Sequence, residues 1–125
     1  FKIGQREFPI QILPIAYEKK IAQALSPILR QLDGFTEKGL GEIFKERGAE
    51  AIITFQDALI DVVLVICKRY DPTVDRGFIE ENAITADLLP IIIKQLDKNK
   101  IGDMVSSFFF KIATLSPKIL KSPQS

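Results

Sequence analysis

The stretch that decides the fold is Ala51–Tyr70, AIITFQDALIDVVLVICKRY, in which apolar residues fill most positions. Its few polar positions recur at spacings of three, four and seven residues: Thr54, Asp57, Asp61 and Lys68. Residues at these spacings share one side of a helix, so the pattern predicts a helix with a thin polar stripe and an apolar remainder. The aspartates make this helix too polar to span a bilayer. We therefore expect a buried central helix around which the rest of the chain packs.

Composition limits the classes of function that this chain of 125 residues can carry. The length suits one domain with a real hydrophobic core. Because 17 Lys and Arg residues are balanced by 16 Asp and Glu residues, the basic excess typical of a nucleic-acid-binding protein is missing. The hydrophobic share of 46% is high for a small monomer, which favours self-association or a protein partner.

The chain contains no histidine, so it lacks the commonest general base and the commonest zinc ligand. The single cysteine, Cys67, cannot form an internal disulfide, which fits a reduced cytosolic setting. Its neighbours Val65 and Ile66 are apolar, so we expect an inert, buried thiol. We predict no catalytic residues, no cofactor and no metal. An enzymatic alternative rests on Asp57 and Asp61, which lie one helical turn apart and could share a proton or bind a metal ion.

The segments before the central helix contain a hairpin signal and a helix signal. Residues 1–13 alternate apolar and polar positions around Gly4, which predicts a short β-hairpin with a type II′ turn. Pro14 opens a helical pattern, and we expect Pro27 to kink that helix rather than divide it in two. Residues 36–48 keep a weaker helical spacing because glycines interrupt it.

The segments after the central helix are more polar. Residues 71–81 gather acidic side chains without the ligand spacing or the glycine of a calcium loop, so we expect a solvated turn. Thr85 is expected to cap the next helix, with Pro90 near its first turn. A last helix is predicted over residues 104–115.

The predicted fold class is therefore mainly α. We expect a compact helical domain over residues 1–116, with about five to six helices and a short N-terminal β-hairpin. Residues 117–125 are expected to form a flexible basic tail, because they hold too little apolar surface to become ordered.

Two apolar side chains fall on polar faces of the predicted helices. Successive helical side chains point about 100° apart, so the three phenylalanines at 108–110 cannot all enter one core. Phe110 is left on the face of Ser107, and Ile91 shares a face with Lys94. An exposed Phe forgoes about 2 kcal/mol of burial. We therefore predict that Phe110 and Ile91 contact a partner or a second subunit.

One segment resembles part of a known family. Residues 77–99, GFIEENAITADLLPIIIKQLDKN, combine an aromatic or aliphatic pair, Glu-Glu-Asn, a cap containing Thr, and an amphipathic helix that ends near Asn. This resembles a segment recurrent in tail assembly chaperones of long-tailed bacteriophages, whose opening hairpin and proline-led helix are also similar to the start of this chain. The residues that carry the resemblance are Phe78, Ile79, Glu80, Glu81, Asn82, Thr85, Leu88, Leu89, Ile92 and Leu96, with Phe1, Ile3, Gly4, Arg6, Phe8 and Pro14 at the opening.

The resemblance implies a small helical protein without catalytic activity that acts in the host cell cytoplasm during phage assembly. Its partners would be the tape measure protein, which it would bind and keep soluble, and the tail tube subunit. The alternative is a self-assembling structural subunit, a homo-oligomer that buries its surplus apolar surface against its own copies. The hydrophobic runs also raise a membrane-active alternative, but Asp57, Asp61 and Lys94 interrupt them. We expect no membrane and no nucleic acid among the partners.

Overall fold

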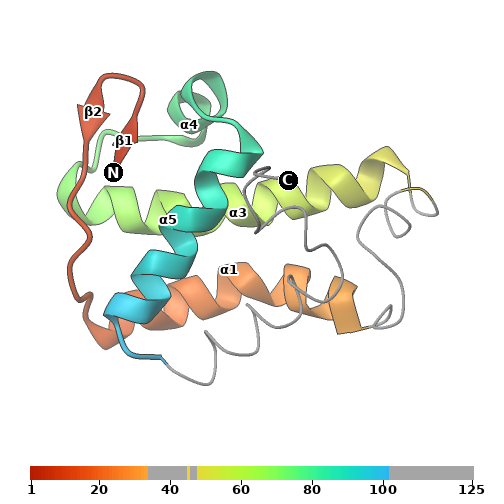
Figure 1. Ribbon diagram of the computed structural model, residues 1–125, viewed down its shortest axis with the longest axis horizontal. Helices are drawn as coiled ribbons and strands as arrows, with labels where there is room; N and C mark the ends of the chain where they lie inside the picture. The colour runs from red at the N-terminus through yellow and green to blue at the C-terminus, as the bar shows by residue number, and fades with distance from the viewer. Residues whose placement is uncertain (34–44, 46–47, 102–125) are drawn as a thin grey trace, which may run out of the picture.

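The computed structural model describes residues 1–33, 45 and 48–101 (Figure 1). In chain order these residues form β1 (Lys2–Ile3), β2 (Arg6–Glu7), α1 (Ile15–Asp33), α3 (Ala49–Tyr70), α4 (Arg76–Asn82) and α5 (Thr85–Lys98). The expected mainly helical fold with an N-terminal hairpin is confirmed. The described part holds four helices, fewer than the five to six expected. The helices predicted over 36–48 and 104–115 fall largely or wholly outside the described residues, as does the predicted tail, 117–125.

Helix α3 is the central element, as the pattern of Ala51–Tyr70 predicts. Helices α1, α4 and α5 all contact it (Figure 1). The predicted polar stripe is confirmed by four positions that are exposed or half-buried: Thr54, Asp57, Asp61 and Lys68. The buried residues of α3 lie on the remaining faces: Ala51, Phe55, Ala58, Leu59, Ile60, Val62, Val63, Ile66 and Cys67.

Helix α1 begins directly after Pro14 and runs continuously through Pro27. The expectation of one helix rather than two is therefore confirmed. Its buried residues Ile21, Leu25 and Ile28 recur at spacings of four and three, which places them on one face. This face joins the same core as α3, which α1 contacts directly.

The segment between α3 and α5 differs from the sequence expectation. Residues 71–81 were predicted to form a solvated turn, but only their first part is a turn and the rest is the short helix α4. Asp75 occupies the N-cap position, and its carboxylate accepts a hydrogen bond from the N–H of Phe78 at 2.8 Å. A capping carboxylate stabilises a helix start, which explains how so short a helix forms.

The cap of α5 also differs from the expectation. Thr85 was predicted as the cap, but it is the first helical residue, and Ile84 takes the N-cap position. The Asp87 carboxylate accepts a hydrogen bond from the Ile84 N–H at 3.2 Å and satisfies this donor. The Thr85 hydroxyl instead accepts a hydrogen bond from Gln56 Nε2 at 3.1 Å, so a contact with α3 takes the place of a local cap.

The N-terminal hairpin docks on α4. Arg6 lies with its guanidinium carbon 4.5 Å from the centroid of the Phe78 ring and donates a hydrogen bond to Asp71 Oδ2 at 2.9 Å. Gly4 has a φ of 60°, as the predicted turn requires. A Cβ atom at Gly4 would lie 2.9 Å from Asn82 Oδ1. Both the turn and the close approach of α4 therefore require glycine at this position.

The connector between the hairpin and α1 is bound to the end of α5. Asn99 Oδ1 accepts a hydrogen bond from the Leu13 N–H at 2.9 Å, and Asn99 Nδ2 donates one to the Leu13 carbonyl at 2.8 Å. Gln95 Nε2 donates to the Gln11 carbonyl at 2.8 Å. These bonds satisfy backbone groups of a segment that pairs with no strand in the described part of the chain.

The burial of α3 predicts the effect of a charge in its core. Val63 has no exposed surface, so Val63→Asp would place a carboxylate there without a partner. This costs several kcal/mol, which is comparable to the whole stability of a small domain, and we expect the variant to be unfolded at 25 °C. Circular dichroism melting checks this result. The control is Ile52→Asp on the same helix, where 39% exposure predicts a small change. An unchanged melting temperature for Val63→Asp would contradict the central position of α3.

The two glycines near α4 provide a matched pair for the docking of the hairpin. Gly4→Ala combines a positive φ with a close contact, so we expect it to lower the free energy of unfolding by about 1–2 kcal/mol. Gly77→Ala lies inside α4 with its nearest contact at 3.5 Å, so the better helix propensity of Ala should raise stability by up to about 1 kcal/mol. Urea denaturation compares the two variants. Equal stability for both would show that the hairpin does not dock on α4.

Candidate binding groove

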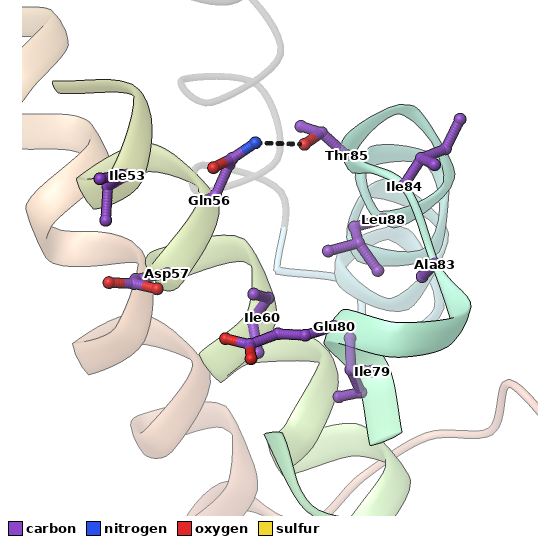
Figure 2. A pocket seen from close by; sticks show the side chains of 10 residues that line it. All are labelled: Ile53, Gln56, Asp57, Ile60, Ile79, Glu80, Ala83, Ile84, Thr85 and Leu88. Atoms are coloured by element: carbon purple, nitrogen blue, oxygen red, sulfur yellow. Dashed lines mark hydrogen bonds between the residues drawn. The ribbon is translucent and has the colours of Figure 1, made fainter. Parts of the chain in front are cut away.

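A groove of about 470 Å³ lies between α3 and the corner at which α4 leads into α5 (Figure 2). Its apolar lining includes the buried side chains of Ile60, Ile79 and Leu88. Two further isoleucines in the lining are exposed, Ile53 on α3 at 53% and Ile84 at the corner at 66%. Exposed apolar side chains beside an apolar hollow are typical of a surface that binds another molecule.

The polar residues of the groove differ between its two ends. At one end Gln56 and Thr85 join α3 to α5 through their side-chain hydrogen bond (Figure 2). Away from that bond, the lining contains two acidic residues, Asp57 on α3 and Glu80 on α4. The Glu80 side chain extends from α4 toward α3 in Figure 2. The groove therefore combines apolar surface with a negatively charged portion.

Arg76 connects α4 to α3 beside this acidic portion. Its Nη2 donates to Asp57 Oδ1 at 2.9 Å, and its Nη1 donates to Asp61 Oδ1. The three side chains are 39%, 50% and 48% exposed, so each ion pair contributes at most about 1 kcal/mol to stability. One guanidinium thus binds both aspartates of the enzymatic alternative. In the part of the chain that the structure describes, no group of three or more His, Cys, Asp or Glu side chains could hold a metal ion.

Asp71 has a structural role at the end of α3. Its Oδ1 accepts hydrogen bonds from the Thr73 hydroxyl at 2.6 Å and from the Thr73 N–H at 3.1 Å. These bonds, followed by the positive charge of Arg6, lower the pKa of the Asp71 carboxyl below its ordinary value. The ionised carboxylate therefore fixes the turn and binds the hairpin through Arg6.

Cys67 lies in the core, as predicted, with no exposed surface. Burial, with a smaller contribution from the negative charge of Asp71, raises the pKa of its thiol to about 12. The thiol is protonated at neutral pH, and the thiolate is the nucleophilic form, so Cys67 acts as packing.

The two predicted contact residues have different outcomes. The expectation that Ile91 is exposed is wrong, because Ile91 is 6% exposed and belongs to the core. Helix α5 buries Leu88, Ile91 and Gln95 at spacings of three and four, so its buried face is wider than its apolar stripe. The connector adds to this face through Gln11, which binds Gln95. Phe110 lies outside the described residues, and its contact with a partner stays a prediction.

Sequence reasoning missed the residues that stand out in the groove. Ile53 shares its helix face with Gln56 and Asp57, three and four residues later, and this apolar position on a polar face is the signal that could have identified it. Ile84 is an apolar residue in the short turn between α4 and α5. Its exposure depends on the angle between two helices, and no local pattern records that angle.

Comparison with known proteins finds no matching family model, no matching curated protein and no matching solved structure. Among the described residues, no helix combines the length and the apolar character that crossing a membrane requires. A functional proposal therefore rests on the groove and on the resemblance that residues 77–99 carry.

The burial of Cys67 predicts that alkylation follows unfolding. At pH 8, which is far below a pKa of about 12, the native protein should react with a maleimide far more slowly than a free thiol does. Addition of urea should make labelling complete. The control is Ile15→Cys in a Cys67→Ala background, because position 15 is 67% exposed and should be labelled in the native state. If native wild-type protein is labelled as rapidly as the Ile15→Cys control, Cys67 is accessible and its predicted burial is wrong.

Proposed function

We propose that this protein is a tail assembly chaperone of a long-tailed bacteriophage. It binds the helical tape measure protein in the host cell cytoplasm, keeps it soluble while the tail assembles, and helps to recruit tail tube subunits. One observation carries this proposal: the segment that resembles this family, 77–99, also forms one wall of the groove. Four lining residues come from the positions that carry the resemblance: Ile79, Glu80, Thr85 and Leu88.

The groove has the chemistry that a helix-binding chaperone needs. An amphipathic helix binds a protein by placing its apolar face in an apolar groove, with anchor residues three or four positions apart. Ile53 and Ile84 leave apolar surface exposed on the two walls of this groove. Covering such surface is favourable by about 25 cal/mol for each Å² of apolar area. Binding of a helix therefore compensates for the exposure of these side chains.

The second part of the resemblance supports the same proposal. The opening of the chain and the 77–99 segment lie far apart in sequence but pack together, with Arg6 over Phe78 and Gly4 against Asn82. All four residues are among those that carry the resemblance. The hairpin thus positions the helix that supplies one wall of the groove.

A self-assembling structural subunit is the second candidate. Ile12 and Ile15 are 64% and 67% exposed, and they lie near the start of α1, outside the lining of the groove. Two exposed isoleucines this close in sequence favour contact with another chain, and a second copy is the simplest such chain. In this candidate the function is permanent assembly rather than temporary binding.

Co-expression with the tape measure protein of the same phage tests the proposal. We expect the tape measure protein to enter the soluble fraction and to co-purify with this chain, and to be insoluble without it. Sedimentation velocity of the purified chain at several concentrations provides the comparison with the second candidate. An assembly of one fixed size, combined with an insoluble tape measure protein, would support the structural subunit and contradict the chaperone.

A further inference from the structure

The charged residues of the groove indicate what kind of helix it accepts. We propose that the groove binds an amphipathic helix whose apolar stripe is flanked by Lys or Arg, with the basic side chains placed against Glu80 and Asp57. The inference rests on the proposed helix-binding function and adds the charge of the partner. Its basis is the apolar surface of the groove together with the sign of its charge.

The apolar part of the groove determines where an anchor side chain lies. Ile53 and Ile84 come from opposite walls and are both more than half exposed, whereas Ile60 and Leu88 are buried. Figure 2 shows Ile53 on α3, Ile84 on the opposite wall, and Ile60 and Leu88 at positions between them. The hydrogen bond between Gln56 and Thr85 lies between the two exposed isoleucines in that view, so Ile53 and Ile84 form separate contact points for a bound helix. A helix lying across the groove would therefore cover Ile53 and Ile84 with different residues of its apolar stripe.

The charged part of the groove determines the sign of the flanking residues. The residues that line the groove include Asp57 and Glu80 but no Lys or Arg. Glu80 is exposed and has no ion pair within the described part of the chain. Arg76 pairs with Asp57, so Glu80 is the carboxylate of the lining that keeps its charge unpaired. This surplus of negative charge attracts a basic helix and repels an acidic one.

Two synthetic peptides of about 20 residues, each a labelled amphipathic helix, provide the probe. Both carry the same apolar stripe, but Lys flanks it in one and Glu in the other. Fluorescence anisotropy with the full chain measures their affinities. We expect the Lys peptide to bind at least about tenfold more tightly in about 0.1 M salt, and the difference to shrink in about 1 M salt, where charges are screened. Equal affinities at low salt would overturn the inference.

Two variants with matched controls test the position of the peptide. Ile84→Ser should weaken binding of the Lys peptide about tenfold, whereas Ile15→Ser, an equally exposed isoleucine outside the groove, should not. Glu80→Lys should abolish the preference for the Lys peptide, whereas Glu81→Lys, the next residue on α4 and also exposed, should retain most of it. All four positions are exposed, so melting temperatures should stay close to that of the wild type. Equal effects of a variant and its control would place the peptide elsewhere and overturn the inference.

The same variants separate this inference from the proposed function. If the protein binds the Lys peptide but the tape measure protein stays insoluble on co-expression, the inference about the groove stands. The proposed chaperone function is then contradicted. If the Ile84→Ser variant still keeps the tape measure protein soluble, the chaperone function stands. The groove is then not its binding site, and the inference is overturned. If the wild type self-associates and Ile84→Ser abolishes this, a second copy occupies the groove and the inference fails.

Discussion

Burial of most of the apolar surface of α3 is the constraint on which the rest of the structure depends. Helices α1, α4 and α5 each contact α3, so the core forms around one helix rather than between equal partners. The stripe stays near the surface, and its polar residues hold the neighbouring elements. Asp57 and Asp61 bind Arg76 of α4, and Gln56 binds Thr85 of α5. Helix α3 thus contributes the centre of the core and also the side chains that bind α4 and α5 at the groove.

The wall formed by α4 and the start of α5 is held by side-chain contacts from several directions. Arg6 of the hairpin stacks on Phe78, and Arg76 binds α3. Exposed ion pairs and cation–π contacts each contribute about 1 kcal/mol or less. Ile79 of α4 and Leu88 of α5 are also buried in the core that α3 shares, so apolar packing holds this wall together with the ion pairs.

Local sequence patterns predicted the elements that depend on local chemistry. The repeat of apolar residues in Ala51–Tyr70 was sufficient to predict the central helix, and the surroundings of Cys67 predicted its burial. The hairpin around Gly4 was predicted in the same way. In each case the decisive interaction lies within the segment or follows from an apolar face that must be covered.

The features that sequence reasoning missed depend on contacts between distant segments. Ile91 lies on a face that its neighbours make polar, but the packing of α5 buries it. Threonine is a common helix cap, but the Thr85 hydroxyl accepts a hydrogen bond from Gln56, 29 residues earlier in the chain. The groove itself arises from the angle at the α4–α5 corner, which no periodic pattern encodes. The candidate site was therefore not predictable from local patterns, although the family resemblance pointed to residues that line it.

Amide hydrogen exchange of the full chain, with and without the tape measure protein, tests most directly whether the groove is the binding surface. Partner binding should slow exchange at residues 79–88, because the corner would lose local opening when a helix covers it. Residues 15–28 of α1 should keep their exchange rates. Slower exchange confined to α1, with the corner unchanged, would contradict the account and place the partner on the surface of Ile12 and Ile15.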